Sequence, residues 1–435
     1  MPDVSPDTVA VLGFVSLFVL MLLRVPVGMA MGLVGVTGFG YLTGATPALK
    51  MVGQTSMRIV TDYTFGVIPM FLLMGAIVSR SGMSREMFQA ANRFVGHWRG
   101  GLGIATIAAC AGFAAISGSS VATAATFSTV AYPEMRRFDY PQSFATGVIA
   151  AGGTLGAMFP PSIVLAVYGL ITQQDIGRLF VAGILPGLLA VSMYMITIAV
   201  IGRLRPGWLP TAPASDWRAR LQAVRDVWAP TLLFLFVIGG LYGGLFTPTE
   251  AGGMGAGGAL LISVARRRLS RADLLQSLLQ ATRTAAAVFT VLIGAILFGY
   301  FLTVTEVPQK VTTFVTGLGL GPHGVLVLIM MMYLVLGCLM DAMAMIILTV
   351  PIVFPVIQAL GFDPIWFGVI IVMTVELGLI HPPVGMNVFV IKTVVKDVSF
   401  STIFYGVLPF VVTDIIRLAI LIAFPIIALY LPSRM

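Results

Sequence analysis

Two halves of this chain interrupt their apolar segments at matching positions, 222 residues apart. The clearest pair of interruptions is Pro160-Pro161 and Pro382-Pro383. The same offset relates further pairs, namely Pro26 and Pro248, Gly35 and Gly257, Pro133 and Pro355, Gly156 and Gly378, and Asp175 and Asp397. A chain of this kind has to fold as two similar halves, each with a broken apolar helix, and such breaks point to a binding site.

The composition predicts a membrane protein. The chain has 435 residues, of which 58% are hydrophobic and 10% charged, whereas soluble domains carry about 25% charged residues. Apolar runs long enough to cross a ~30 Å hydrocarbon layer recur at 8–23, 63–79, 179–202, 227–246, 284–304 and 400–430. The short alternating segments of a β-barrel are absent. The predicted fold class is therefore an all-α polytopic membrane protein without a soluble domain.

Several other functions are disfavoured by simple features. The N-terminus lacks the basic region of a cleavable signal, so the first helix is expected to stay. Cys110 and Cys338 lie far apart in apolar stretches and give neither a disulfide framework nor a metal spacing. The net charge of +8 does not indicate nucleic acid, because the basic residues lie between membrane helices.

Basic residues in the loops set the orientation. If the N-terminus lies outside, most of the 25 Lys and Arg fall in cytoplasmic loops, notably around 80–99, 203–225 and 266–283. The C-terminus then also lies outside. The first half starts outside and the second inside, which makes them inverted repeats related by an axis in the membrane plane.

This arrangement requires one segment per half that does not cross the membrane. We expect repeat one over 1–205, a cytoplasmic linker with a surface helix over 206–225, and repeat two over 226–435. The repeats contain scaffold helices (about 8–60 and 226–268), re-entrant helical hairpins (101–131 and 311–360) and broken helices (143–171 and 365–395). Irregular backbone at membrane depth needs protein or a wet cavity around it, so the hairpin tips should face an interior site.

The hairpin tips and helix breaks carry the chemistry. Tip one is Ser117-Gly118-Ser119-Ser120 and tip two is 337–341, while break one is 153–162 and break two is 375–384. Prolines inside a helix free carbonyl oxygens, which are ligands for small cations, and helix N-termini favour anions. Small residues at tip one are also typical of close helix packing, but the matching break favours a binding site.

Individual polar residues leave alternatives open. Asp341 corresponds to Ser119 at the 222 offset and could bind a cation, cap a helix, or do both. Glu376 and His381 in break two could contact ion or substrate, or only the broken backbone. Asp414 and Arg417 are three residues apart and are predicted to pair. Lys392 is interpreted as a residue that sets topology.

The sequence resembles the large permease subunit of TRAP (tripartite ATP-independent periplasmic) transporters over nearly its whole length. The stretches that carry the resemblance are 116–125, 132–135, 150–156, 159–163, 182–189 and 381–390. The resemblance implies an elevator-type transporter of the ion-transporter superfamily, with Na⁺ bound at tips and breaks. It also implies three partners in the bacterial inner membrane system: a separate small subunit of four membrane helices, a periplasmic substrate-binding protein, and an organic acid anion as substrate.

The resemblance also assigns residues. It implies a first sodium region at Ser117, Gly118, Ser119, Ser120, Gly153, Thr154 and Gly156. It implies a second at Asp341, Gly378, His381, Pro382 and Gly385. Substrate contacts are expected at Ser120, Pro160, Pro161, Ser162 and Asn387. No transition metal is expected.

Other functions remain as alternatives. A stand-alone sodium- or proton-coupled carboxylate symporter would share the duplicated hairpins. A channel can also contain re-entrant helices. An intramembrane enzyme would need a nucleophile–base pair or a metal cluster, for which three His and two distant Cys are a poor basis. The identity of the acid, the number of ions and the oligomeric state are left open.

Overall fold

The structure, a computed structural model of the chain, describes residues 4–205, 207–337, 340–383 and 385–435. All regular secondary structure in those residues is helical. The first half contains α1 (Pro6–Leu22), α2 (Val27–Thr43), α3 (Ala45–Thr61), the 3-10 helix η1 (Tyr63–Gly66), α4 (Val67–Arg80), α5 (Met83–Val95), α6 (Gly101–Ser117), α7 (Ser120–Arg137), α8 (Gln142–Met158), α9 (Ile163–Thr172) and α10 (Ile176–Leu204).

The second half follows the same order after one extra helix. It contains α11 (Trp217–Asp226), α12 (Trp228–Tyr242), α13 (Pro248–Ala265), α14 (Arg271–Val304), α15 (Val307–Gly317), α16 (Gly321–Gly337), α17 (Ala342–Ala359), α18 (Pro364–Ile380), α19 (Met386–Val394), α20 (Phe400–Ala423), α21 (Ile426–Leu429) and the 3-10 helix η2 (Pro432–Arg434). The bounds of α7 and α17, and of α8 and α18, differ by 222 at each end.

One long helix of the second half is broken in the first. The counterpart of α14 is the succession α3, η1 and α4, which covers residues 45–80. At the interruption the side chain of Asp62 accepts the backbone N–H of Thr64 at 2.9 Å and caps the 3-10 turn. The α14 sequence contains no proline and continues for 34 residues.

The helices are long and apolar enough for a membrane. Six spans in the described residues meet that condition, at Tyr63–Arg80, Gln142–Thr172, Ile176–Leu204, Arg271–Val304, Ala342–Ala359 and Phe400–Ala423. A seventh is possible if α11 and α12, bent by 47°, form one span. Large apolar side chains also face outward, such as Leu22 (83% exposed) and Leu261 (71%). The chain is therefore a multi-span, all-helical membrane protein.

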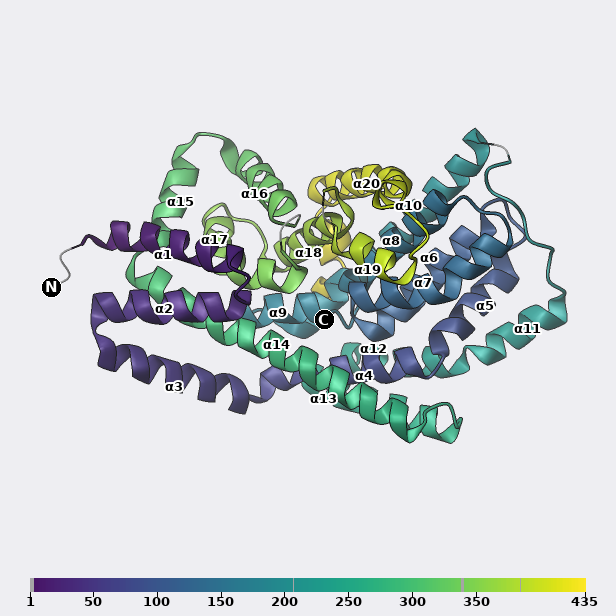
Figure 1. Ribbon diagram of the computed structural model, residues 1–435, viewed down its shortest axis with the longest axis horizontal. Coiled ribbons are helices and arrows are strands. Elements are labelled where there is room, and N and C mark those ends of the chain that lie inside the picture. Colours follow the sequence, from purple (N-terminus) through teal and green to yellow (C-terminus); the bar gives the residue numbers. More distant parts are fainter. Residues whose placement is uncertain (1–3, 206, 338–339, 384) are drawn as a thin grey trace.

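The broken helices occupy the middle of the molecule. The apolar window of Gln142–Thr172, which is α8 and α9, is 94% buried, whereas that of α10 is only 28% buried. Figure 1 shows α8, α9 and α18 at the centre, with α1, α2, α3 and α14 extending to one end. The interior therefore contains the first interrupted segment and α18 of the second, whereas Pro383 in the second break is exposed.

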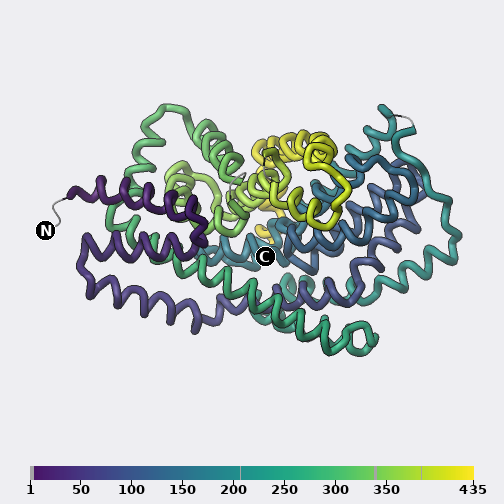
Figure 2. The backbone as a smooth tube through the Cα atoms, in the orientation of Figure 1, coloured from purple at the N-terminus to yellow at the C-terminus, as the bar shows by residue number. Residues whose placement is uncertain are grey.

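The two halves are interleaved rather than merely adjacent. The tube in Figure 2 shows α14 of the second half running along α2 of the first. Gly28 and Gly35 permit this contact, because a Cβ on either would lie 2.6 Å from the backbone of Val291 or Leu297. Small residues allow helix backbones to approach closely in membranes.

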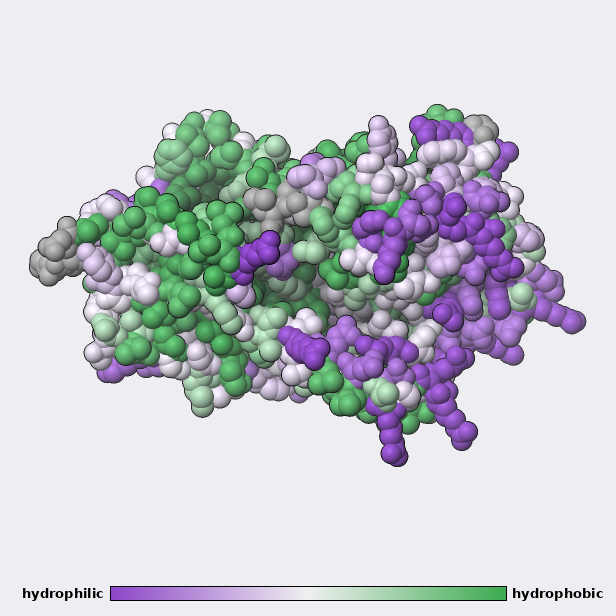
Figure 3. Space-filling view, in the orientation of Figure 1, coloured by the Kyte–Doolittle hydropathy of each residue, from purple (hydrophilic) through white to green (hydrophobic). Residues whose placement is uncertain are grey.

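Charged side chains gather at one end of the molecule. Figure 3 shows hydrophilic residues over α5, α11 and the end of α13, and an apolar surface over α1 and α2. At that end Arg266 binds Glu86 through two hydrogen bonds of 2.9 and 2.7 Å. The loops that the sequence assigns to the cytoplasm, around 80–99, 203–225 and 266–283, thus come together.

Candidate functional site

Tip one is a tight turn between α6 and α7. Gly118 has a φ of 61°, a left-handed conformation that glycine adopts without strain. Ser119 then caps α7 by accepting the N–H of Ala122 at 3.3 Å. The hydroxyls of Ser117 and Thr123 are 3.4 Å apart within the same turn. The sequence Ser-Gly-Ser-Ser therefore ends one helix and starts the next inside the protein.

Break one separates α8 from α9 at the double proline. The peptide bond between Pro160 and Pro161 is cis. Ser162 caps α9 by accepting the N–H of Leu165 at 3.2 Å, and its hydroxyl donates to the carbonyl of Ala157. Among the described residues, none donates a hydrogen bond to the backbone carbonyl oxygens of residues 159–161. The break thus supplies uncommitted carbonyl oxygens.

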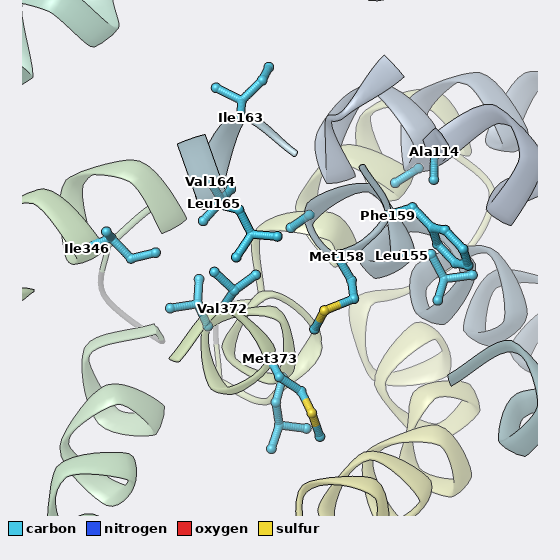
Figure 4. Close-up of a cluster of buried hydrophobic side chains, with 14 of the residues drawn as sticks. Ala114, Leu155, Met158, Phe159, Ile163, Val164, Leu165, Ile346, Val372 and Met373 are labelled. Atoms are coloured by element: carbon cyan, nitrogen blue, oxygen red, sulfur yellow. The ribbon is translucent and has the colours of Figure 1, made fainter. Parts of the chain in front are cut away.

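Apolar side chains surround part of break one. Figure 4 shows Leu155, Met158 and Phe159 before the break and Ile163, Val164 and Leu165 after it. Ile346 from α17 and Val372 from α18 lie opposite. Buried carbonyl oxygens that accept no hydrogen bond favour a ligand that they can coordinate.

Tip one lies directly on break one. A Cβ on Gly118 would be 2.1 Å from the carbonyl oxygen of Pro161, and a Cβ on Gly156 would be 2.5 Å from that of Ser119. The hydroxyl of Ser120 donates to the carbonyl of Thr154 at 3.4 Å. The structure therefore brings the residues predicted for the first sodium region into one place.

The second half has a contact at the equivalent glycine, but with another part of its tip, because Gly337 corresponds to Ala115 rather than to Ser119. Gly337, at the end of α16, approaches Gly378 of α18 so closely that a Cβ on either would be 2.9 Å from the Cα of the other. Gly378 is the counterpart of Gly156 at the 222 offset. Residues 338, 339 and 384, which belong to the predicted tip two and break two, lie outside the described residues.

Asp341 caps a helix, as one interpretation of the sequence proposed. Its carboxylate accepts the N–H groups of Met343 at 3.0 Å and Ala344 at 3.2 Å at the start of α17. The side chain is exposed, so it retains acceptor capacity for a cation. Ser119 caps α7 at the corresponding position.

Break two separates α18 from α19. The peptide bond between Pro382 and Pro383 is cis, as in break one. His381 Nδ1 lies 2.5 Å from the carbonyl oxygen of Pro382, so the ring contacts the broken backbone. Gly385 has a φ of 56° and precedes α19. The structure thus places the ring of His381 and the turn at Gly385 within the same break.

Asn387 connects α19, which follows break two, to α8, which precedes break one. It lies in the first turn of α19, and its side chain is completely buried. Its Nδ2 donates to the carbonyl of Ala150 in α8 at 3.4 Å, while its Oδ1 has no hydrogen-bond partner among the described residues. A buried, unsatisfied amide oxygen is costly, so Asn387 remains a candidate for ligand contact. Lys392 instead donates to the carbonyl of Lys396 at 2.8 Å.

A buried polar chain joins the two halves behind the breaks. Asp414 and Arg417 pair at 3.0 Å, which confirms the prediction for these two residues. Arg417 also contacts Glu376 of break two at 3.3 Å. Tyr194 donates to Asp414 at 2.7 Å and lies 3.3 Å from the hydroxyl of Thr154. The sequence did not predict this role of Tyr194, because nothing in α10 distinguishes it from the neighbouring polar residues Ser192 and Thr197.

Two cavities flank the hairpins, away from the tips. The larger, about 1340 Å³, lies between α3, the end of α9, α14 and α17. The smaller, about 550 Å³, lies between α4, α5 and α7. Residues 222 positions apart line the two cavities. The smaller cavity is lined by Arg80, Glu86 and Thr129, and the larger cavity by their respective counterparts Leu302, Pro308 and Pro351. Neither cavity is lined by the predicted site residues, so the cavities flank the tips and breaks without including them.

Helices broken inside a bundle of membrane spans, with hairpin tips packed on the breaks, characterise membrane transporters. Comparison with known proteins agrees. The family profile described as "Tripartite ATP-independent periplasmic transporter, DctM component" matches residues 14–427. The chain belongs to this family of large transporter permeases. It is therefore a transport protein rather than an enzyme, and the family is one of the bacterial inner membrane.

Curated relatives differ in the solutes for which they are named. The C4-dicarboxylate TRAP transporter large permease protein DctM of Pseudomonas aeruginosa is 38% identical over 372 residues, covering 85% of this chain and 86% of that protein. The ectoine TRAP transporter large permease protein TeaC of Halomonas elongata is 31% identical, covering 95% and 96%. The chain is therefore the large permease of a system for a small organic solute.

One relative and one solved structure add further information. The isethionate TRAP transporter permease protein DctMQ of Oleidesulfovibrio alaskensis is 31% identical over 97% of this chain, which spans only 64% of that longer protein. A crystal structure of the Alcanivorax borkumensis YdaH transporter matches with a TM-score of 0.54 at 13% identity, covering 88% of this chain and 90% of that one. The second likeness concerns the fold alone.

Proposed function

We propose that this chain is the membrane-transport subunit of a sodium-coupled system that imports a small organic acid anion. One observation carries the proposal: in each half, a hairpin tip packs on the broken helix of the same half at corresponding glycines, Gly156 and Gly378. A tip and a break together form a cradle of backbone oxygens. Two such cradles provide two cation regions of similar construction.

The ligands available suit Na⁺. Region one offers freed carbonyls and hydroxyls at Ser117, Gly118, Ser119, Ser120, Gly153, Thr154 and Gly156. Region two offers Asp341, Gly378, His381, Pro382 and Gly385. These groups are mostly neutral oxygens, which are hard ligands. The described residues contain no group of three His, Cys, Asp or Glu side chains placed to hold a metal ion.

The substrate anion is proposed to lie between the two breaks. Ser162 caps α9, and Asn387 lies in the first turn of α19, so two helix N-termini are available. Ser120, Pro160 and Pro161 would complete the contacts. A dianion moving inward against 100 mV is opposed by about 4.6 kcal/mol, at about 2.3 kcal/mol per charge. Two sodium ions would cancel this energy, and a third would let the voltage drive uptake.

We further propose an elevator motion of inverted repeats. The two cavities occupy corresponding positions in the two halves but differ in volume, at about 1340 and 550 Å³. If the halves are inverted, corresponding cavities open to opposite sides of the membrane. Movement of the hairpins and broken helices relative to α2, α4, α13 and α14 would enlarge one cavity while reducing the other.

The proposed assembly has three components. The family name supports a tripartite system, and the length of the DctMQ relative supports an additional membrane part. We propose a separate four-helix membrane subunit and a periplasmic binding protein that delivers the acid. Both termini of this chain would be periplasmic, because the charged end of the molecule in Figure 3 carries the loops assigned to the cytoplasm.

Uptake by the reconstituted system tests the proposal. Proteoliposomes containing this chain and the small subunit receive the binding protein, a labelled candidate acid and an inward gradient of either Na⁺ or H⁺. We expect accumulation only with Na⁺ and only with the binding protein. Accumulation under a proton gradient without Na⁺ would contradict the ion assignment. Accumulation by this chain alone would favour a stand-alone symporter.

A further inference from the structure

A continuous buried chain of polar side chains connects the two broken helices. It runs from Thr154 in α8 through Tyr194 in α10 and Asp414 and Arg417 in α20 to Glu376 in α18. Successive polar atoms are 3.3, 2.7, 3.0 and 3.3 Å apart. All five side chains are completely buried. Four helices from both halves therefore share one hydrogen-bonded network.

The ends of this chain are equivalent positions. Thr154 and Glu376 are 222 residues apart, so they occupy the same place in the two broken helices. Each lies two residues before the glycine that contacts its own hairpin tip, Gly156 or Gly378. If α8 or α18 shifts relative to α10 and α20, the hydrogen bond at that end of the polar chain has to change. The affected residue, Thr154 or Glu376, occupies the equivalent position in the two helices.

The network is arranged so that its bonds depend on one another. Arg417 Nη2 serves both Asp414 Oδ1, at 3.0 Å, and Glu376 Oε2, at 3.3 Å. Glu376 Oε1 and Arg417 Nε and Nη1 have no hydrogen-bond partner among the described residues. The hydroxyl of Tyr194 likewise lies between Asp414 and Thr154. Because all five side chains are completely buried, a change in one of these bonds alters the strength of its neighbours.

We propose that Tyr194, Asp414 and Arg417 are positioning residues that couple the two cation regions. Binding of Na⁺ at one region fixes the position of the broken helix in that half. The hydrogen bonds of the polar chain then restrict the position of the broken helix in the other half. The second ion then binds to a region that is already ordered, which is positive cooperativity. This inference rests on the proposed sodium coupling and adds a means by which the two regions communicate.

Sodium-dependent thermal stability of the purified full-length chain tests this inference. The unfolding midpoint is measured against NaCl concentration, with choline chloride keeping the ionic strength constant. Tyr194→Phe removes only the hydroxyl that joins Thr154 to Asp414. Arg417→Lys keeps the charge but not the forked geometry. Tyr140→Phe is the control, because Tyr140 is equally buried and donates at 2.7 Å to the carbonyl of Pro210, away from both breaks.

We expect a steep sodium dependence in the unmodified chain, with a Hill coefficient above one. In Tyr194→Phe and Arg417→Lys the half-saturating sodium concentration should rise by about fivefold or more, and the Hill coefficient should fall toward one. The Tyr140→Phe curve should match the unmodified one. The unfolding midpoint measured in choline chloride alone shows how much stability each variant loses independently of Na⁺. The test therefore requires only that one of the two variants folds.

The outcomes separate the two proposals. An unmodified chain that Na⁺ stabilises no more than choline overturns the proposed function and this inference together. A steep response that persists unchanged in the folded variants overturns the inference alone. An equal loss in Tyr140→Phe also overturns it, because the effect would then follow from losing any buried hydroxyl.

Discussion

Replacing Gly156 by Ala tests whether tip one has to lie against break one. The new Cβ would be 2.5 Å from the carbonyl carbon and oxygen of Ser119 and 2.6 Å from the nitrogen of Ser120. Favourable contacts begin at about 3.5 Å, so the tip has to move by roughly 1 Å. These are backbone atoms, and they cannot rotate away as a side chain would.

The stability of the chain should change little in this variant. Alanine is favoured over glycine within a helix by about 1 kcal/mol, whereas overpacking costs about 1–3 kcal/mol. The net loss is therefore about 0–2 kcal/mol. Binding geometry, by contrast, tolerates displacements of only about 0.5 Å. We expect the half-saturating sodium concentration to rise by about tenfold or more, as for losses of ligand placement at other metal sites.

Sodium-dependent uptake and the sodium-dependent unfolding midpoint both measure this effect. Gly257→Ala in α13 is the matched control, since a Cβ there has nothing within 4 Å. Gly378→Ala should be intermediate, because its Cβ would be 2.9 Å from the Cα of Gly337. A Gly156→Ala protein with unchanged sodium dependence would refute the argument that the tip and the break form one cradle.

Three other predictions concern the tip, the buried charges and the orientation. Gly118→Ala should lower the yield of folded protein in size-exclusion chromatography, because a left-handed φ costs about 1–2 kcal/mol and the Cβ would be 2.1 Å from the Pro161 oxygen. Arg417→Met should lower the unfolding free energy by about 3–5 kcal/mol, since two buried carboxylates lose their partner; neutralising Glu376 and Asp414 as well should restore part of it. A cysteine replacing Arg267 should react with an impermeant thiol reagent only from the cytoplasmic side, and labelling from the periplasm would contradict the orientation.

The parts of the fold that could be predicted are those with a local sequence cause. Pro160-Pro161 and Pro382-Pro383 end α8 and α18 because proline lacks the N–H that a helix needs. Gly118 permits the turn at tip one by itself. Both signals depend on residue type, and the double proline is visible twice, 222 residues apart, whereas Met340 stands at the position equivalent to Gly118. The predicted hairpins and breaks therefore correspond to α6–α7, α8–α9, α16–α17 and α18–α19.

The parts that could not be predicted depend on how helices rotate and pack. Tyr194 meets Asp414 across 220 residues, and Arg417 meets Glu376 across 41. No spacing in the sequence encodes such contacts, because they arise only when α10, α18 and α20 face one another. The interruption between α3 and α4, by contrast, has a local signal in the capping side chain of Asp62.

The two halves have similar helix order and similar breaks, but they differ in which positions carry charged side chains. At equivalent positions the first half has Ser119 and Thr154, and the second has Asp341 and Glu376. The acidic side chains of the tips and breaks therefore lie in the second half alone. Glu376 is held there by Arg417, which also pairs with Asp414. Tyr194 joins Asp414 to Thr154, so the neutral hydroxyl of the first half and the carboxylate of the second half contact the same buried group of side chains. The equivalent positions thus differ in charge but are joined through α10 and α20.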